Sequence, residues 1–426
     1  MDGELTIVAM TPDSAPEGAT PLEGILLPGM SNAHSHAFQR VLAGNTETAS
    51  KNGDSFWTWR EAMYGALERL GPDAFEALTA DAFRTMRHAG YTRVCEFHYV
   101  HNAPDGKPYA DPNELAHRVV AAARSAGIGL TLLPVLYRFS DFGEAPPHAH
   151  QRRFVRSLDA YAAAWRALRD AYRNEPGLVI GIAPHSLRAV APSDLQQLVE
   201  LAREHAGNHA VPFHIHVSEQ QREVDACVAQ HGISPIALLA ENVALDERWC
   251  LVHATHATPD ERDAIVRAGA VVALCPTTEA NLGDGIFPAA DFVCAGGRIA
   301  IGSDSNASID VAEELRWLEY VQRLALQQRN VLHDDATPQV ARFVYQRCAT
   351  GGSQASGART GHLAPGYRFE AILLGADARF DGLSAGFRQA QGDKEAQADN
   401  GEPDAALAAA IFRSGGWNLR ETLGFR

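Results

Sequence analysis

Two histidines, His34 and His36, stand one residue apart at the end of an apolar run that begins at Ile25. Residues i and i+2 of a β-strand point to the same face, so the two imidazole rings can bind one metal ion together. A catalytic zinc site takes about three protein ligands and keeps one position open for water, so other strands should supply the remaining ligands. The alternative interpretation of the pair is two histidines at the protein surface.

A later apolar run, residues 211–219, contains a second pair, His214 and His216. These two share a face as well, and His216 lies closer to the C-terminal end of the run. Asp304, in the segment Ile301-Gly-Ser-Asp-Ser-Asn, offers a carboxylate after another apolar run, although an aspartate in this context often caps a helix instead. The pattern predicts a metal site whose ligands come from separate strands.

Lysine is rare in this chain and occurs only at Lys51, Lys107 and Lys394. Some hydrolytic barrels bridge two metal ions with a carbamylated lysine on the fourth strand. The corresponding run here, residues 178–187, contains no lysine, so we expect a single divalent metal ion.

Eight short apolar runs alternate with amphipathic segments. Near-continuous apolar strands separated by helices are typical of parallel strands covered on both faces, and eight such units predict an α/β fold, a (β/α)8 TIM barrel. A doubly wound open sheet is the competing architecture, but no Gly-x-Gly-x-x-Gly sequence follows the first run. The predicted strands span residues 25–36, 91–100, 128–137, 178–187, 211–219, 249–256, 270–279 and 298–306, and the predicted helices span 72–89, 113–126, 151–174, 193–206, 221–241, 258–268 and 311–329.

Polar residues gather at or just beyond the C-terminal ends of these runs. A barrel has its active site at this end, so residues from separate strands should meet there. Any single one of the 18 histidines is more often exposed or hydrogen-bonded than functional, yet the coincidence over so many strand ends favours a site. The residues concerned are His34, His36, His98, Tyr99, Tyr137, His185, His216, Glu219, His253, His256 and Asp304.

The two ends of the chain differ in sequence pattern from the part between them, where apolar runs alternate with amphipathic segments. We expect residues 25–354 to form the barrel, and residues 1–24 and 355–426 to form a small accessory β-domain. Within the second segment, residues 391–404 are polar and predict a loop, and the sequence around Trp417 predicts a further strand or hairpin.

Charge and cysteine usage exclude several classes of protein. Lys and Arg together number 37 against 52 Asp and Glu, a net charge of -15, which argues against nucleic-acid or anionic-membrane partners. The six cysteines form no Cys-x-x-Cys pair, as expected of reduced thiols. The first residues have no signal-peptide pattern and no apolar run reaches the ~18 residues of a membrane span, so we expect a cytoplasmic protein.

These motifs resemble the amidohydrolase superfamily, in which His-x-His lies on strand one, histidines lie on strands five and six, and an aspartate lies on strand eight. Within it, the chain is similar to the formimidoylglutamate deiminase family of bacterial histidine breakdown, from about Ile25 to the tail. The superfamily motifs do not specify a substrate, whereas the second and fourth of the matching segments are specific to that family. The matching segments are residues 27–40, 54–64, 214–220 and 276–288.

The resemblance implies a reaction and a role for each site residue. The reaction is the zinc-dependent hydrolysis of N-formimino-L-glutamate to N-formyl-L-glutamate and ammonia, by a chain that we expect to form a homodimer. One Zn²⁺ per chain would be bound by His34, His36, His216 and Asp304, with Glu219, His253 and Asp304 in acid–base roles. Gln39, Arg60, Tyr99, His185 and Arg188 would contact the substrate, the two arginines binding its carboxylates.

Other interpretations remain open at this point. The same metal barrel also serves deaminases and chlorohydrolases of aromatic heterocycles, which would not need two arginines in the pocket. Each arginine can instead form a surface ion pair, and Glu219 can be an acidic residue of a first helical turn. A non-enzymatic, metal-binding or scaffolding relative is disfavoured, because the proposed ligands, Glu219 and His253 are all present.

Overall fold

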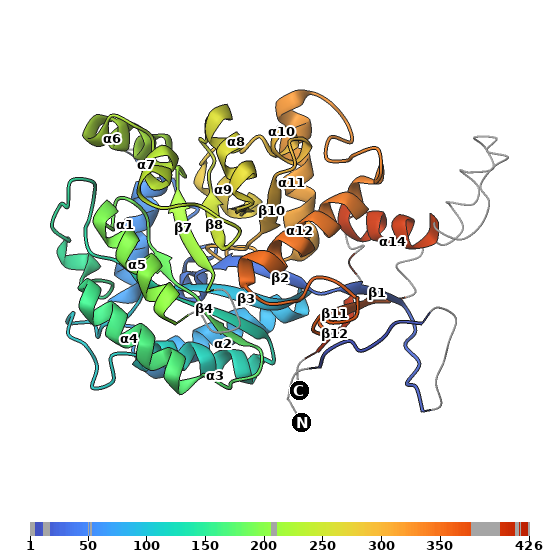
Figure 1. Ribbon diagram of the computed structural model, residues 1–426, viewed down its shortest axis with the longest axis horizontal. Helices are drawn as coiled ribbons and strands as arrows, with labels where there is room; N and C mark the ends of the chain where they lie inside the picture. Colours follow the sequence, from blue (N-terminus) through green and yellow to red (C-terminus); the bar gives the residue numbers. More distant parts are fainter. Residues whose placement is uncertain are drawn as a thin grey trace.

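The computed structural model describes residues 5–11, 18–49, 51, 53–205, 211–375, 401–413, 417 and 419–424. Parallel strands in this part of the chain form a (β/α)8 barrel, which confirms the predicted fold (Figure 1). The strands make two hydrogen-bonded groups, and the bridges Ser35–Asp304 and Ile182–Phe213 join the groups into a closed ring. The barrel strands are β2 (Met30–Ser35), β3 (Tyr91–His98), β4 (Gly129–Leu136), β5 (Leu178–Ile180) with β6 (Ala183–Pro184), β7 (Phe213–Val217), β8 (Trp249–His253), β9 (Val271–Leu274) and β10 (Arg298–Ile301).

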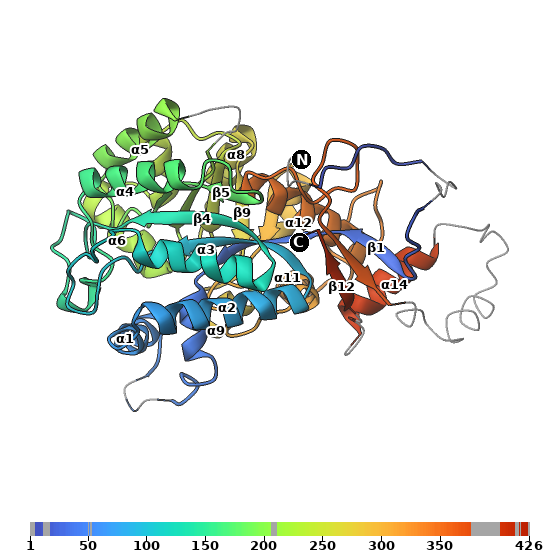
Figure 2. The same cartoon turned by 90° about the horizontal axis from the view of Figure 1, so that it is seen from below.

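Most predicted helices are confirmed within a few residues, and Figure 2 shows two of them, α2 and α3, side by side along the barrel. The helix predicted over residues 151–174 is shorter and begins only at Leu158. The predicted helix 221–241 is wrong as a single element, because Gly232 adopts a left-handed conformation that ends one helix and Ser234 caps the next. None of the helices in the described ranges is long and apolar enough to cross a bilayer. The confirmed helices are α2 (Pro72–His88), α3 (Glu114–Ala126), α4 (Leu158–Ala171), α5 (Pro192–Glu204), α8 (Pro259–Ala268) and α11 (Val311–Leu326), and the divided one forms α6 (Gln221–His231) and α7 (Pro235–Asn242).

Several helices were not predicted from the sequence. α1 follows the first barrel strand, α9 and α10 follow β9, and α12 packs against β10 and β2. Their apolar positions are short in extent or interrupted by polar residues, which weakens the helical period that prediction relies on. They are α1 (Phe56–Leu67), α9 (Pro276–Leu282), α10 (Ala289–Cys294), α12 (Val340–Ser356) and α14 (Gly401–Phe412).

The first predicted strand, residues 25–36, is two strands in the structure. β1 (Ile25–Pro28) leaves the barrel and pairs antiparallel with β11 (Ala371–Leu374), which also pairs with β12 (Leu419–Leu423). Pro28 lacks a backbone N–H and Gly29 follows it, so the ladder breaks there and the barrel strand begins at Met30.

This three-stranded sheet lies beside the barrel, near α12 and α14 (Figure 1). Of the predicted loop 391–404, residues 391–400 lie outside the described residues, and residues 401–404 begin α14 instead of continuing a loop. The strand predicted around Trp417 is found slightly later, as β12.

A buried ion-pair cluster ties the three-stranded sheet to the barrel. Arg93 Nη2, from β3, and Arg368 Nε each lie 3.1 Å from Glu370 Oε1, just before β11. Thr92 Oγ1 donates a hydrogen bond to Glu370 Oε2 at 3.2 Å. Glu370 is fully buried, so its carboxylate depends on these partners for the solvation that it loses on folding.

We therefore expect Glu370→Gln to lower the free energy of unfolding by about 3–5 kcal/mol, because the neutral amide leaves two buried guanidinium groups without their carboxylate. Chemical denaturation monitored by circular dichroism measures the change. Glu421→Gln, at an exposed position on β12, is the matched control and should change stability little. Equal stability of the two variants would contradict a structural role for the cluster.

Candidate metal centre and pocket

Four predicted side chains converge at the C-terminal ends of the barrel strands: His34, His36, His216 and Asp304. The Nε2 atoms of His34 and His216 are 2.9 Å apart, those of His34 and His36 3.1 Å, and those of His36 and His216 3.3 Å. Asp304 Oδ1 lies 3.5 Å from Nε2 of His34 and 3.4 Å from Nε2 of His36. Ligands about 2.1 Å from a tetrahedral zinc ion lie roughly 3.4 Å from one another, so this donor set fits such an ion.

The ring nitrogens that point away from the cluster determine which form of each imidazole is present. His36 Nδ1 lies 3.0 Å from the carbonyl oxygen of Phe97, and His216 Nδ1 lies 3.0 Å from that of His185. A ring that donates Nδ1–H to a carbonyl keeps a lone pair on Nε2, which is the form that binds a metal.

The electrostatics of the cluster also favour neutral rings. Burial, with the neighbouring His34 ring, lowers the pKa of His36 to about 3. Burial likewise holds the pKa values of His34 and His216 well below the usual value for histidine. All three imidazoles are therefore held neutral, and those of His36 and His216 present lone pairs to the common point between them.

The backbone at these strand ends is held in unusual conformations. Ser218, His253 and Asp304 have φ angles of 51°, 68° and 42°, in the left-handed region that residues other than glycine rarely occupy. Hydrogen bonds from Asp304 N to His34 O and from His36 N to Asp304 O, both 2.9 Å, fasten the end of β10 to β2. Such strain clusters at functional sites, where the surrounding structure enforces it.

His214, the other candidate on the same strand, does not join the cluster. Its Nε2 atom lies 2.8 Å from the carbonyl oxygen of Ala355 in α12. Two residues along a strand span about 6.6 Å, so His214 and His216 share a face but lie at different depths in the barrel. Of the two histidines left open by the sequence, the structure brings His216 to the cluster.

A second group of titratable side chains borders the four donors. His253 Nε2 lies 3.7 Å from Glu219 Oε1 and 3.8 Å from Asp304 Oδ2, and His253 Nδ1 lies 3.2 Å from Glu279 Oε1. Burial raises the pKa of Glu219 to about 7, which suits a group that gains and loses a proton near neutral pH. Burial also lowers the pKa of His253, but Glu219, Glu279 and Asp304 outweigh burial and raise it to about 10.

Sequence reasoning missed two carboxylates that orient this group. Glu279 Oε1 contacts His253 and accepts a hydrogen bond from Cys275 N at 2.9 Å. Glu223 Oε2 accepts a hydrogen bond from Glu219 N at 3.0 Å. The signals for Glu279 were its place at the end of the seventh run, residues 270–279, and in the segment 276–288, whereas Glu223 gave no signal beyond its position in a helix.

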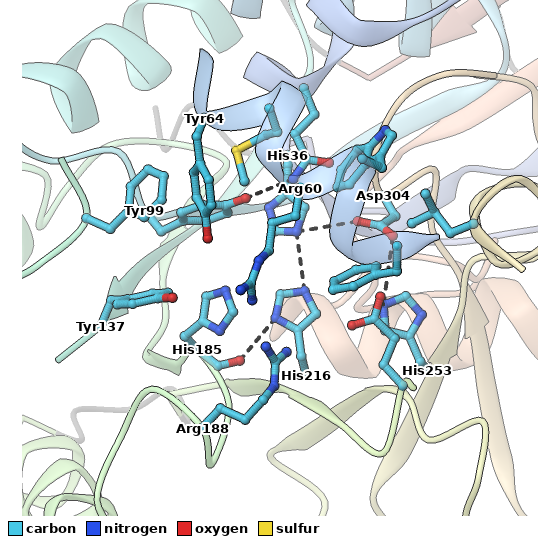
Figure 3. Close-up of a pocket in the computed structure, with 17 residues that line it drawn as sticks. His36, Arg60, Tyr64, Tyr99, Tyr137, His185, Arg188, His216, His253 and Asp304 are labelled. Atoms are coloured by element: carbon cyan, nitrogen blue, oxygen red, sulfur yellow. Dashed lines mark hydrogen bonds and ion pairs between the residues drawn. The ribbon is translucent and has the colours of Figure 1, made fainter. Parts of the chain in front are cut away.

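The four donors His34, His36, His216 and Asp304 are called the metal-type cluster. A cavity of about 540 Å³ opens beside this cluster (Figure 3). The predicted substrate contacts Gln39, Arg60, Tyr99, His185 and Arg188 all line it. Of the other lining residues outside the cluster and its bordering group, the sequence singled out only Tyr137, as a polar residue at a strand end. These remaining walls are mostly aromatic or apolar and come from α1, from the end of α9 and from the loops beyond the strands. They are Phe56, Trp59, Met63, Tyr64, Tyr137, Phe154 and Leu282.

The two predicted arginines point into the same space, beside His185 and His216 (Figure 3). Arg60 comes from α1, and its Nε atom is buried without a hydrogen-bond partner among the described residues. Arg60 as a whole is half-buried, whereas Arg188 is buried and its Nε atom lies 3.9 Å from Glu223 Oε1. Neither arginine is the surface ion pair that the sequence left open.

Three arginine side chains lie close to the indole ring of Trp57 in α1. The Cζ atom of Arg60 lies 4.6 Å from the ring centroid, that of Arg188 5.8 Å, and that of Arg222, from α6, 4.4 Å. An aromatic face attracts guanidinium groups, so one indole ring holds cations that would otherwise repel one another.

Neutral hydrogen-bonding groups complete the cavity. Gln39 Nε2 donates to the hydroxyl oxygen of Tyr99 at 2.8 Å, which fixes the orientation of the amide. Gln39 Oε1 is buried and has no partner among the described residues. It is therefore free to accept a hydrogen bond from a bound molecule.

The chain is similar to known enzymes over most of its length. The profile described as the amidohydrolase family matches residues 25–403. The formimidoylglutamate deiminase of Pseudomonas aeruginosa is 49% identical over 387 residues, which are 91% of this chain and 83% of the relative. The 5-methylthioadenosine/S-adenosylhomocysteine deaminase of Natronomonas pharaonis is 28% identical over 87% of this chain and 78% of the relative.

A solved structure supports the same relationship. The crystal structure of an amidohydrolase from Brucella melitensis superposes with a TM-score of 0.84 at 37% identity. The alignment covers 99% of this chain and 87% of that chain, so the barrel and the small sheet both have counterparts in one known fold.

The geometry predicts different consequences for the two histidines of β7. His216→Ala removes one of the four donors and should weaken the affinity for a divalent cation by more than about 100-fold, beyond the range for loss of an outer partner. His214→Ala, two residues earlier, is the matched control and should retain parental affinity. Competition with a chromophoric chelator measures both. Loss of affinity in His214→Ala alone would show that the donor set has been misidentified.

Proposed function

The chain belongs to the amidohydrolase family, and on that premise we propose that it is a metal-dependent deiminase that hydrolyses N-formimino-L-glutamate to N-formyl-L-glutamate and ammonia. The observation that carries the proposal is the presence of two arginines, the half-buried Arg60 and the buried Arg188, in the cavity that the metal-type cluster borders. The 49% identity to a formimidoylglutamate deiminase supports the same substrate.

The charge of the cavity suits a dicarboxylate. The proposed substrate has two carboxylates at one end and an uncharged or protonated formimino group at the other. Arg60 and Arg188 can each bind a carboxylate with two parallel hydrogen bonds, and Trp57 holds both guanidinium groups close to the cavity before the substrate arrives. The formimino end is then directed toward His216, Glu219 and the remaining metal-cluster residues.

We assign His34, His36, His216 and Asp304 as the ligands of one Zn²⁺ ion per chain. Imidazole nitrogens with a single carboxylate suit zinc, and the chain offers no lysine on β5 or β6 to bridge a second ion. When bound, such an ion supplies Lewis-acid chemistry and lowers the pKa of a water molecule from 15.7 to about 7.

The side chains around the cluster divide the proton transfers between them. Water adds its oxygen to the formimino carbon, the carbon–nitrogen bond to the terminal nitrogen breaks, and the products are the formyl group and ammonia. Glu219, whose pKa of about 7 allows either protonation state, donates a proton to the terminal nitrogen as it departs. Asp304 Oδ2, on the side of the carboxylate away from His34 and His36, accepts a proton from the attacking water.

His253 is assigned an orienting role. The surrounding carboxylates raise its pKa to about 10, so the imidazole holds its proton at neutral pH and donates a hydrogen bond in place of acting as a base. Glu279, at Nδ1, fixes the ring so that Nε2 faces Glu219 and Asp304. Glu279 is thus a positioning residue for His253.

Deamination or dechlorination of an aromatic heterocycle is the rival function. The aromatic walls of the cavity suit a flat ring, and the more distant relatives include a deaminase of adenine-containing compounds by name. A heterocycle without carboxylates, however, would offer no anionic partner to the half-buried guanidinium group of Arg60 or to the buried one of Arg188. Sites built around polar partners reject such analogues strongly, so we favour the dicarboxylate.

We further propose that the reaction takes place in the cytoplasm as a step of histidine degradation. The relationship to formimidoylglutamate deiminase supports this pathway. All six cysteines are unpaired in the structure, as is usual for proteins of a reducing compartment.

Metal-replete protein should release ammonia from N-formimino-L-glutamate and not from guanine, cytosine or triazines. Arg60→Met and Arg188→Met should each lower kcat/KM for N-formimino-L-glutamate on the order of 100-fold, because a charge-assisted hydrogen bond contributes about 1.5–3 kcal/mol. Coupled ammonia detection gives the rates.

Arg222→Met is the matched control for these variants. Arg222 is exposed and contacts the Trp57 ring without lining the cavity, so its loss should leave kcat/KM within a few-fold of the parent. If both cavity variants also stay within a few-fold of the parent, the carboxylates are not bound by these arginines. Turnover of a heterocycle in place of N-formimino-L-glutamate would move the assignment to the rival function.

Glu219→Gln should lower kcat by roughly 100-fold or more while the metal content stays parental, because the amide preserves size and hydrogen bonding but cannot transfer a proton. The loss should appear in kcat, since a proton given to the departing nitrogen acts in the transition state. Steady-state kinetics with elemental analysis separates the two quantities. A raised KM with unchanged kcat would make Glu219 a binding residue instead.

A further inference from the structure

A second group of potential ligand atoms lies next to the first and shares one residue with it. The His253 imidazole, the Cys275 thiol and the Asp304 carboxylate have donor atoms within 4.8 Å of one another, and all three residues are buried. Cys275 follows β9 and directly precedes α9. The proposed reaction assigns no role to its thiol.

The two oxygens of Asp304 face different groups. Oδ1 lies 3.5 and 3.4 Å from Nε2 of His34 and His36, whereas Oδ2 lies 3.8 Å from Nε2 of His253. One carboxylate can therefore contribute one oxygen to each of two neighbouring cations, as carboxylates do in two-metal sites.

The His253 ring is oriented for the same purpose. Its Nδ1 atom is held by Glu279, and its Nε2 atom is buried with no hydrogen-bond partner among the described residues. Glu219 Oε1 lies 3.7 Å from Nε2 and supplies a further oxygen on the same side. The side chains thus offer an imidazole nitrogen, a thiol sulfur and carboxylate oxygens around one point.

We infer that His253, Cys275 and Asp304 form a second, inhibitory site for a thiophilic divalent cation such as Zn²⁺ or Cd²⁺. Thiolate and imidazole ligands select these ions over Mg²⁺ and Ca²⁺, which prefer oxygen ligands. On binding, the cation forms bonds to the sulfur and to Nε2, and the protons of the thiol and of Nε2 are released to solvent. This proton loss and the nearby first cation make the second site the weaker one, so it fills only when metal is in excess.

Occupation of this site would stop the reaction assigned above. The cation would engage Nε2 of His253 and Oδ2 of Asp304, and it would lie against Glu219, so the water-orienting and proton-transferring atoms would all be occupied. The inhibitory consequence rests on the proposed function, whereas the binding of the cation does not.

Cadmium tests the binding directly, because a cadmium–thiolate bond gives an ultraviolet charge-transfer band. All proteins in the test carry Cys294→Ser, since Cys294 is the exposed cysteine and would bind cadmium by itself. Protein loaded with one equivalent of Zn²⁺ is titrated with Cd²⁺. Cys275→Ala and Cys275→Ser remove the thiol, and Cys250→Ala is the matched control, because Cys250 lies in the same buried cluster of small side chains but outside the ligand group.

The band should appear in the Cys294→Ser parent and in the Cys250→Ala control and be absent from both Cys275 variants, with melting temperatures reported for all four. Excess Zn²⁺ should inhibit ammonia release from N-formimino-L-glutamate, and loss of the Cys275 thiol should raise the inhibitory concentration at least about 10-fold. Excess Mg²⁺ should not inhibit.

A band that persists without the Cys275 thiol, or no band in the parent, would overturn the site. Equal inhibition of the parent and of Cys275→Ser by zinc would overturn its inhibitory role. A cadmium band that depends on Cys275 in a protein without activity on N-formimino-L-glutamate would support the cation site while refuting the proposed function.

Discussion

Three imidazole nitrogens and one carboxylate oxygen are held within 4.8 Å of one another in the buried end of the barrel, and the rest of the structure serves this arrangement. Each group loses hydration on burial, and lone pairs that face a common point repel one another. Hydrogen bonds at Nδ1 of His36 and His216 satisfy the nitrogens that point away from the cluster, but the Nε2 atoms that point into it face one another. A shared cation makes the inner arrangement favourable, so a metal ion and the folded strand ends depend on each other.

The backbone must be shaped closely to bring these donors together. Gly302 lies so near β2 that a Cβ atom there would meet the backbone nitrogen and oxygen of His34 at 2.8 Å, so this position requires glycine. The next residues form a hydrogen-bonded turn in which Asn32 contacts Ser303 and Asn306 contacts Ser35. The strained φ angle of Asp304 is thus enforced by contacts on both sides of the β2–β10 junction.

The sequence predicted the site residues that can be recognised from the two-residue repeat of a strand or from their position at the end of an apolar run. His-x-His marks a strand face through the two-residue repeat, and Asp304 and His253 follow apolar runs at the end where a barrel has its site. It did not separate His214 from His216, because the repeat gives the face of a strand and not the depth. Nor could it identify Glu279 or Glu223, whose roles arise from contacts made by the fold, or the break between β1 and β2, which depends on pairing with the distant β11.

The site is divided between strands and helices, and this division explains why some of its residues could be predicted from the sequence and others could not. The metal-type donors come from strands whose spacing is fixed by the barrel. The two cavity arginines, in contrast, are held by Trp57 on α1, and the same ring contacts Arg222 of α6, a segment far from α1 in the chain. Because α1 lies outside the strand–helix repeat that defines the barrel, it can change without disturbing the donors. The part of the carboxylate specificity that Arg60 carries can therefore evolve in this helix while the hydrolytic chemistry stays with the strands.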